Sequence, residues 1–178
     1  MKTLFGVLLF VVSATAQAPD YPAVKRQTQL FETVLDTAVK QRFEQPFLVL
    51  QETKGAYLEG YGAVFTMEIN LYPLRYRNPF AATPYSEKEL STARTQKLAR
   101  IKDLETLIRE LLRDHGMGLN FLPQDESVAI VVHLFNQAEQ HDMPSQLSVQ
   151  VKKQWLQEAA GRKLTAAEFL QKLSVVSF

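Results

Sequence analysis

Residues 47–71 read FLVLQETKGAYLEGYGAVFTMEINL, and this stretch decides the fold. Odd-numbered residues from Ala63 to Leu71 are all apolar and alternate with mostly polar ones. A period of two along this run predicts a strand with one buried face and one wetter face. The shorter apolar run 47–51 predicts a second strand that pairs with it.

Three glycines lie between these two runs. Gly55, Gly60 and Gly62 favour a bent connection, because glycine adopts positive φ without a steric cost. The connection is therefore either a long hairpin loop or a bulged, strongly twisted ribbon. Since an isolated hairpin is only marginally stable in water, we expect it to pair with further strands or to pack on a helix.

Two long helices are predicted around the hairpin. Residues 24–43 place their apolar side chains on one face of a helix. A second helix begins after Ser86, because Glu89 three residues later completes a capping box, and it ends at Gly116. Its first half is polar nearly all round, so we expect the second half to pack on the core.

Two further strands follow in the second part of the chain. Residues 127–136 are rich in β-branched side chains and apolar on both faces apart from His133, which predicts a central strand. Residues 147–151 alternate and predict a fourth strand. A turn or short helix at 155–161 and a capped helix at 165–173 complete the pattern.

The order of elements is therefore α-β-β-α-β-β-α. This order predicts an α+β fold, with an antiparallel sheet of about four strands and helices packed on one face.

The N-terminus has the pattern of a secretory signal peptide. Lys2 precedes a compact apolar run at 4–12, which is about half of the ~20 residues that a membrane span needs. We expect cleavage after Ala16, so that 1–16 is the signal peptide and 17–178 is a single α+β domain. The alternative is an uncleaved N-terminal anchor. The expected location is the periplasm or the cell exterior, without a lipid anchor and without a transmembrane segment after cleavage.

Composition excludes several function classes. The chain has no cysteine, which removes thiol catalysis, disulfides and cysteine-ligated metals. Removing the signal peptide leaves 19 basic and 19 acidic residues, and a neutral chain is not suited to nucleic acid. It also lacks the polybasic patch that binds anionic lipids.

No catalytic or cofactor motif stands out. His115, His133 and His141 have no metal-ligand spacing, so we predict no metal and no cofactor. Glu59 and Glu68 lie in or near the hairpin and are the candidate carboxylate pair of a hydrolase. A solvated surface acid is the plainer interpretation of Glu68.

Aromatic residues cluster in one part of the sequence. Five of the six tyrosines lie between residues 57 and 85, and arginines lie among them. Tyrosine and arginine are enriched at binding hot spots, and tyrosine also stacks on sugars. The alternative is that these rings pack the loop against the sheet. The predicted binding residues, for a protein or glycan partner, are Tyr57, Tyr61, Tyr72, Arg75, Tyr76, Arg77 and Phe80.

Three phrases carry a resemblance to a family. They are YLEGYGAVF at 57–65, LPQDESV at 122–128 and LTAAEF at 164–169. With them the chain resembles a family of exported bacterial proteins, of the acidobacterial type, for which no activity is known. The resemblance implies export and a single domain, and it supplies no catalytic residue.

These observations lead to three functional hypotheses. The first is a non-enzymatic exported module that binds a partner or assembles in the bacterial envelope through the 57–85 surface. The second is an envelope hydrolase that uses the Glu59 and Glu68 carboxylates. The third is a purely structural partner of a membrane complex.

Overall fold

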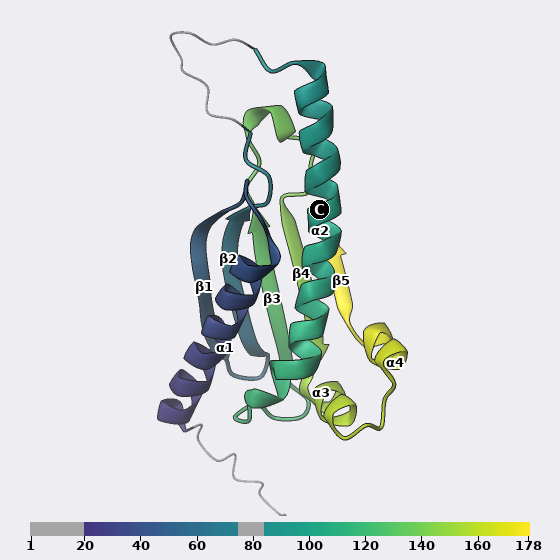
Figure 1. Cartoon of the computed structure of the whole chain (residues 1–178). Coiled ribbons are helices and arrows are strands. Elements are labelled where there is room, and N and C mark those ends of the chain that lie inside the picture. The colour runs from purple at the N-terminus through teal and green to yellow at the C-terminus, as the bar shows by residue number, and fades with distance from the viewer. Residues whose placement is uncertain (1–19, 75–83) are drawn as a thin grey trace, which may run out of the picture.

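The computed structural model describes residues 20–74 and 84–178, in which five strands form one mixed sheet (Figure 1). Strands lie side by side in chain order, and only β2 and β3 are parallel neighbours. The predicted signal peptide lies outside the described residues. The strands are β1 (Leu48–Leu58), β2 (Gly62–Asn70), β3 (Ser127–Leu134), β4 (Gln146–Lys152) and β5 (Ser174–Ser177).

Two long helices, α1 and α2, lie against the same face of the sheet (Figure 1). Two short helices, α3 and α4, lie near the lower end of α2 in this view, before the chain enters β5. None of the helices in the described part of the chain is both long and apolar enough to cross a membrane. The helices are α1 (Tyr21–Arg42), α2 (Glu87–His115), α3 (Lys153–Ala160) and α4 (Ala166–Gln171), with 3-10 turns η1 (Gly116–Gly118) and η2 (Ala138–Gln140).

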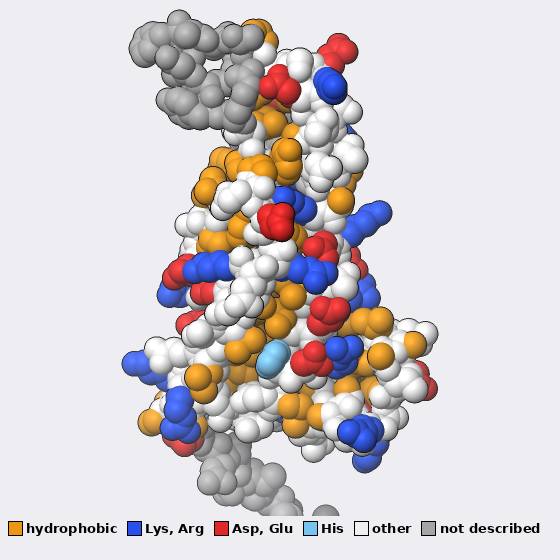
Figure 2. All heavy atoms as spheres, viewed as in Figure 1, with side chains coloured by type: hydrophobic (Ala, Val, Ile, Leu, Met, Phe, Trp, Pro, Cys, Tyr) orange, Lys and Arg blue, Asp and Glu red, His pale blue; other side chains and the backbone are white. Residues whose placement is uncertain are grey.

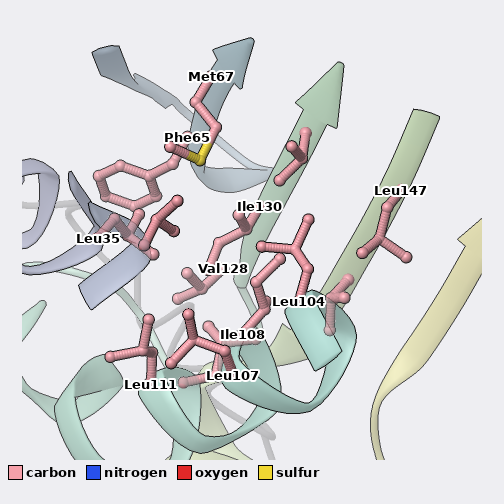
Figure 3. Packing of buried hydrophobic residues seen from close by; sticks show 14 of the residues in the cluster. Leu35, Phe65, Met67, Leu104, Leu107, Ile108, Leu111, Val128, Ile130 and Leu147 are labelled. Atoms are coloured by element: carbon pink, nitrogen blue, oxygen red, sulfur yellow. The ribbon is translucent and has the colours of Figure 1, made fainter. Parts of the chain in front are cut away.

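The core lies between the helices and the sheet. The alternation predicted for 63–71 is confirmed, because Phe65, Met67 and Ile69 are at most 2% exposed. Figure 3 shows Phe65 and Met67 near Leu35 of α1, with β3 and α2 residues beside them. The rings of Phe31 and Phe65 lie 4.7 Å apart, which joins α1 to β2. The predicted central position of β3 is also confirmed.

The expected antiparallel sheet of about four strands was wrong in two respects. First, α2 is 29 residues long, about 43 Å, and carries the chain back along the whole sheet. The next strand therefore starts level with the beginning of β2, so Gly62 pairs with Ser127 and the two strands are parallel. Second, the apolar tail at Ser174–Ser177 adds a fifth strand beside β4.

The first strand is longer than expected. The predicted turn began near Gly55, whereas β1 continues to Leu58 and bulges on either side of Gln51. Gly55 lies within the strand, and α1 approaches it so closely that a Cβ at this position would be 2.4 Å from Cγ2 of Thr28. The actual turn lies between Leu58 and Gly62.

Candidate functional site

A cavity of about 460 Å³ opens between the end of β2 and the N-terminal half of α2. Hydrophobic side chains gather in the upper part of the molecule, beside this half of α2 (Figure 2). Polar groups on the cavity lining come mainly from the first turns of α2, at Ser86, Lys88 and Thr92. We call this cavity the aromatic pocket; its apolar and aromatic lining consists of Pro46, Tyr72, Pro73, Leu74, Tyr85 and Ala93.

Arg100 of α2 fixes one side of the aromatic pocket. Its Nη1 donates to the carbonyl oxygens of Pro46 (2.5 Å) and Leu71 (2.6 Å), and its Nη2 donates to that of Glu44 (2.9 Å). Its guanidinium carbon lies 5.4 Å from the centre of the Tyr72 ring. A planar guanidinium suits this combination of several acceptors and one ring. Arg100 therefore holds the loop before β1 and the end of β2 in a defined position against α2.

The start of α2 forms another side of the pocket. The predicted capping box is confirmed: Ser86 Oγ accepts from the Glu89 amide (3.2 Å), and Glu89 Oε2 accepts from the Ser86 amide (2.7 Å). This reciprocal pair satisfies two backbone donors at the helix start. It therefore fixes the direction in which Lys88 and Thr92 present their side chains to the pocket.

Lys97 supports the same half of α2 from within. Its side chain is fully buried, and its Nζ donates to Phe135 O (2.7 Å) and Gln140 Oε1 (3.0 Å). Burial lowers the pKa of Lys97 to about 8, because the charged form loses hydration. This contact ties the loop after β3 to α2. The sequence interpretation missed it, since a lysine in a polar helical segment normally indicates a solvated face.

The structure divides the predicted binding residues between two places. Tyr57 and Tyr61 lie at the β1–β2 turn, whereas Tyr72 follows the far end of β2. β2 has nine residues, so about 26 Å of strand separates the two groups. The described tyrosines therefore do not form one surface. The remaining predicted residues lie outside the described residues: Arg75, Tyr76, Arg77 and Phe80.

Tyr57 is largely engaged in packing. Its hydroxyl donates to Glu126 Oε1 (3.1 Å), and its ring meets that of Phe121 edge-on at 5.3 Å. Burial and, to a smaller extent, the Glu126 hydrogen bond raise the pKa of Tyr57 to about 12. The same Glu126 oxygen accepts from the Gly60 amide (2.9 Å). Tyr61, by contrast, is 42% exposed at the turn.

Glu126 was not among the sequence candidates, although it is only 6% exposed. It joins the β1–β2 turn to the start of β3, because its Oε1 receives both the Tyr57 hydroxyl and the Gly60 amide. The signal in the sequence was an acid placed directly before a strand that is apolar on both faces. The backbone amide of Lys153 donates to the backbone carbonyl oxygen of Glu126 (2.8 Å).

The two candidate catalytic acids do not face each other. Glu59 lies in the turn, whereas Glu68 is level with Gln51 of β1 and His133 of β3. The β2 residues between them span about 20 Å, and paired glycosidase carboxylates are about 5–9.5 Å apart. Glu59 and Glu68 therefore do not form the carboxylate pair that a hydrolase of this kind needs.

Metal-ligating side chains do not converge in the described part of the chain. Residues 20–74 and 84–178 contain no group of three or more His, Asp or Glu side chains placed to hold a metal ion. His115 lies at the end of α2, and Nδ1 of His141 is 3.1 Å from Ala138 O.

The chain was also compared with models of protein families, with curated proteins and with solved structures, and none of these comparisons found a match.

Proposed function

We propose that this protein is an exported bacterial binding module that takes its partner in the aromatic pocket. The observation that carries this proposal is a formed, mainly apolar cavity with Tyr72 and Tyr85 in its wall and Arg100 holding one side. Its volume of about 460 Å³ lies within the range of ligand sites, about 300–1,000 Å³. Export is expected from the signal-peptide pattern at 1–16.

The chemistry of the lining favours an apolar or aromatic side chain of a protein partner. Two prolines, a leucine and an alanine supply half of the lining residues other than the tyrosines. A glycan would need several polar groups that converge on its hydroxyls. Here the polar groups, including Ser86 and Lys88, come from one edge, the start of α2. That edge suits the backbone of a peptide whose side chain enters the pocket.

The test fills the pocket without disturbing the core. Thr92 is exposed and lines the pocket, whereas Thr95 is exposed on the same helix and does not line it. We expect Thr92→Trp to reduce the amount of partner recovered from envelope extract at least about tenfold, which corresponds to 1.4 kcal/mol. Thr95→Trp is the matched control and should retain the recovery of the unmodified protein.

Recovery is measured by quantitative mass spectrometry of the captured proteins, and melting temperatures are recorded for all three proteins. Equal recovery with Thr92→Trp and Thr95→Trp contradicts the proposal. If Thr92→Trp loses recovery and also has a much lower melting temperature, the result supports the alternative that the tyrosines only pack the loop against the sheet.

A further inference from the structure

A second hollow, of about 540 Å³, lies between the N-terminal half of α1 and the outer edge of β1. It lies at the opposite end of β1 from the aromatic pocket, next to the β1–β2 turn. We call it the α1–β1 groove; its lining includes Tyr21, Lys25, Thr28, Gln29, Lys54 and Tyr57.

The outer edge of β1 is partly closed by carboxylates of α1. Asp36 Oδ1 accepts from the Thr53 amide (2.9 Å), and Glu32 Oε1 accepts from the Gly55 amide (2.7 Å). Carboxylate oxygens thus stand where the carbonyl oxygens of a neighbouring strand would be. An edge strand with free amides is a template for pairing, so this arrangement protects the middle of β1.

The carboxylates of α1 do not cover the last residues of β1, beyond Gly55. Backbone groups alternate between the two edges of a strand, and the register is regular from Lys54 to Leu58. Because the Gly55 amide points outward to Glu32, the amide and carbonyl of Tyr57 point outward as well. Among the described residues no side chain or backbone group pairs with them. This part of the edge faces the groove.

We propose that the α1–β1 groove binds an extended, acidic segment of another polypeptide, which adds to the edge of β1 at Tyr57. The segment pairs its backbone with the outward amide and carbonyl of Tyr57, as in other cases of strand addition. Lys25 and Lys54 line the groove, and the only acid among its lining residues, Glu32, already accepts from the Gly55 amide. Two lysines against one glutamate leave the lining of the groove with a net charge of +1, which favours an acidic segment.

This site is independent of the aromatic pocket and goes beyond the proposed function. Nine residues of β2, about 26 Å, separate the two ends of the sheet. Failure of one proposal therefore leaves the other unaffected.

The test uses a pool of acetylated, amidated pentapeptides in which glutamate alternates with valine, threonine or isoleucine. Binding to the full protein is followed by the backbone amide resonances and by hydrogen exchange of the Tyr57 amide. A pool with lysine in place of glutamate tests charge, and a pool with N-methylated backbones tests strand pairing. We expect only the acidic, unmethylated pool to shift the Tyr57 resonance and to slow its exchange at least about tenfold.

Two glutamines of α1 provide matched variants. Gln29 is exposed and lines the groove, whereas Gln41 is exposed and lies outside it. Gln29→Trp should abolish the effect at Tyr57, and Gln41→Trp should retain it. The proposal is overturned if no member of the acidic pool acts at millimolar concentration, if the lysine or N-methylated pool acts equally well, or if Gln29→Trp and Gln41→Trp bind alike.

Discussion

The guanidinium carbon of Arg100 lies 5.4 Å from the centre of the Tyr72 ring. The same guanidinium donates to three backbone carbonyl oxygens, those of Glu44 and Pro46 before β1 and that of Leu71 after β2. One side chain of α2 thus connects two segments, at 44–46 and 71–72, that are far from it in the sequence. Arg100 thereby fixes the positions of Tyr72 and of the loop that contains Pro46, and both of these residues line the aromatic pocket.

Replacement of Arg100 should lower the free energy of unfolding. Arg100→Lys replaces the two terminal nitrogens of a planar fork with one ammonium nitrogen, which cannot occupy both of their donor positions. We expect a loss of about 1–3 kcal/mol in the free energy of unfolding, measured by urea denaturation. Lys102→Met removes an exposed cation two residues away and should change it by less than about 0.5 kcal/mol. Equal effects would contradict the role given to Arg100.

Gly55 should tolerate no side chain. A Cβ at this position would lie 2.4 Å from Cγ2 of Thr28 and 2.6 Å from Cε1 of Phe65. Gly55→Ala is therefore expected to cost about 1–3 kcal/mol through overpacking. Gly118→Ala, where no atom lies within 4 Å of the added Cβ, is the control and should leave the urea midpoint nearly unchanged. A stable Gly55→Ala protein would show that α1 does not sit so close to β1.

Two aspartates on the helices should differ in importance. Asp36→Ala leaves both the amide and the hydroxyl of Thr53, which is 2% exposed, without their acceptor, at a cost of about 1–3 kcal/mol. Asp103→Ala breaks a pair with Arg42 in which both side chains are about 40% exposed, so water screens the lost interaction and the cost should be smaller. Urea denaturation of the two variants should rank them in this order, and the reverse order would contradict the account of the β1 edge.

Stability should rise with pH above about 8. Burial lowers the pKa of Lys97 and Lys153 to about 8, from 10.5 in the unfolded chain, so the unfolded chain binds more protons between these values. The cost of burying the charges is fully present below pH 8 and is relieved as the pH rises towards 10.5. The raised pKa of Tyr57 acts in the opposite direction only above pH 10.

Urea denaturation between about pH 7.5 and 9.5 measures this rise, expected to be on the order of 1–2 kcal/mol per lysine. The double variant Lys97→Met with Lys153→Met should show a flatter profile over the same range. An identical slope in both proteins would mean that neither lysine is held in its buried position.

Local signals in the sequence were reliable where one segment alone determines the structure. The period of two at 63–71 predicted the buried face of β2, and Ser86 with Glu89 predicted the start of α2. In each case nearest neighbours in the chain supply the physical cause, either side-chain alternation or reciprocal capping.

Features that depend on contacts between distant segments could not be predicted from local sequence patterns. The direction of β3 depends on the length of α2, which returns the chain to the start of β2. β5 has four residues, which is too short for a recognisable period, and it forms because β4 offers an edge. Gly55 lies in β1 at a point where Thr28 of α1 leaves no room for a side chain, a relation that only the packed helix reveals.

The candidate site was predicted in part for the same reason. Tyr72 was among the expected residues, whereas Pro46, Thr92 and Arg100 come from other segments of the chain. Clustering of tyrosines in sequence suggested one surface, but an extended strand separates its two ends by about 26 Å.

Photo-crosslinking from within the aromatic pocket tests the central claim most directly. A photoreactive phenylalanine analogue is introduced at Thr92 and, in a second protein, at Thr95, and both are irradiated in the cells that produce the protein. The account predicts a discrete adduct of one partner from position 92 and none from position 95. No adduct from position 92, or the same adduct in equal yield from both positions, would contradict it.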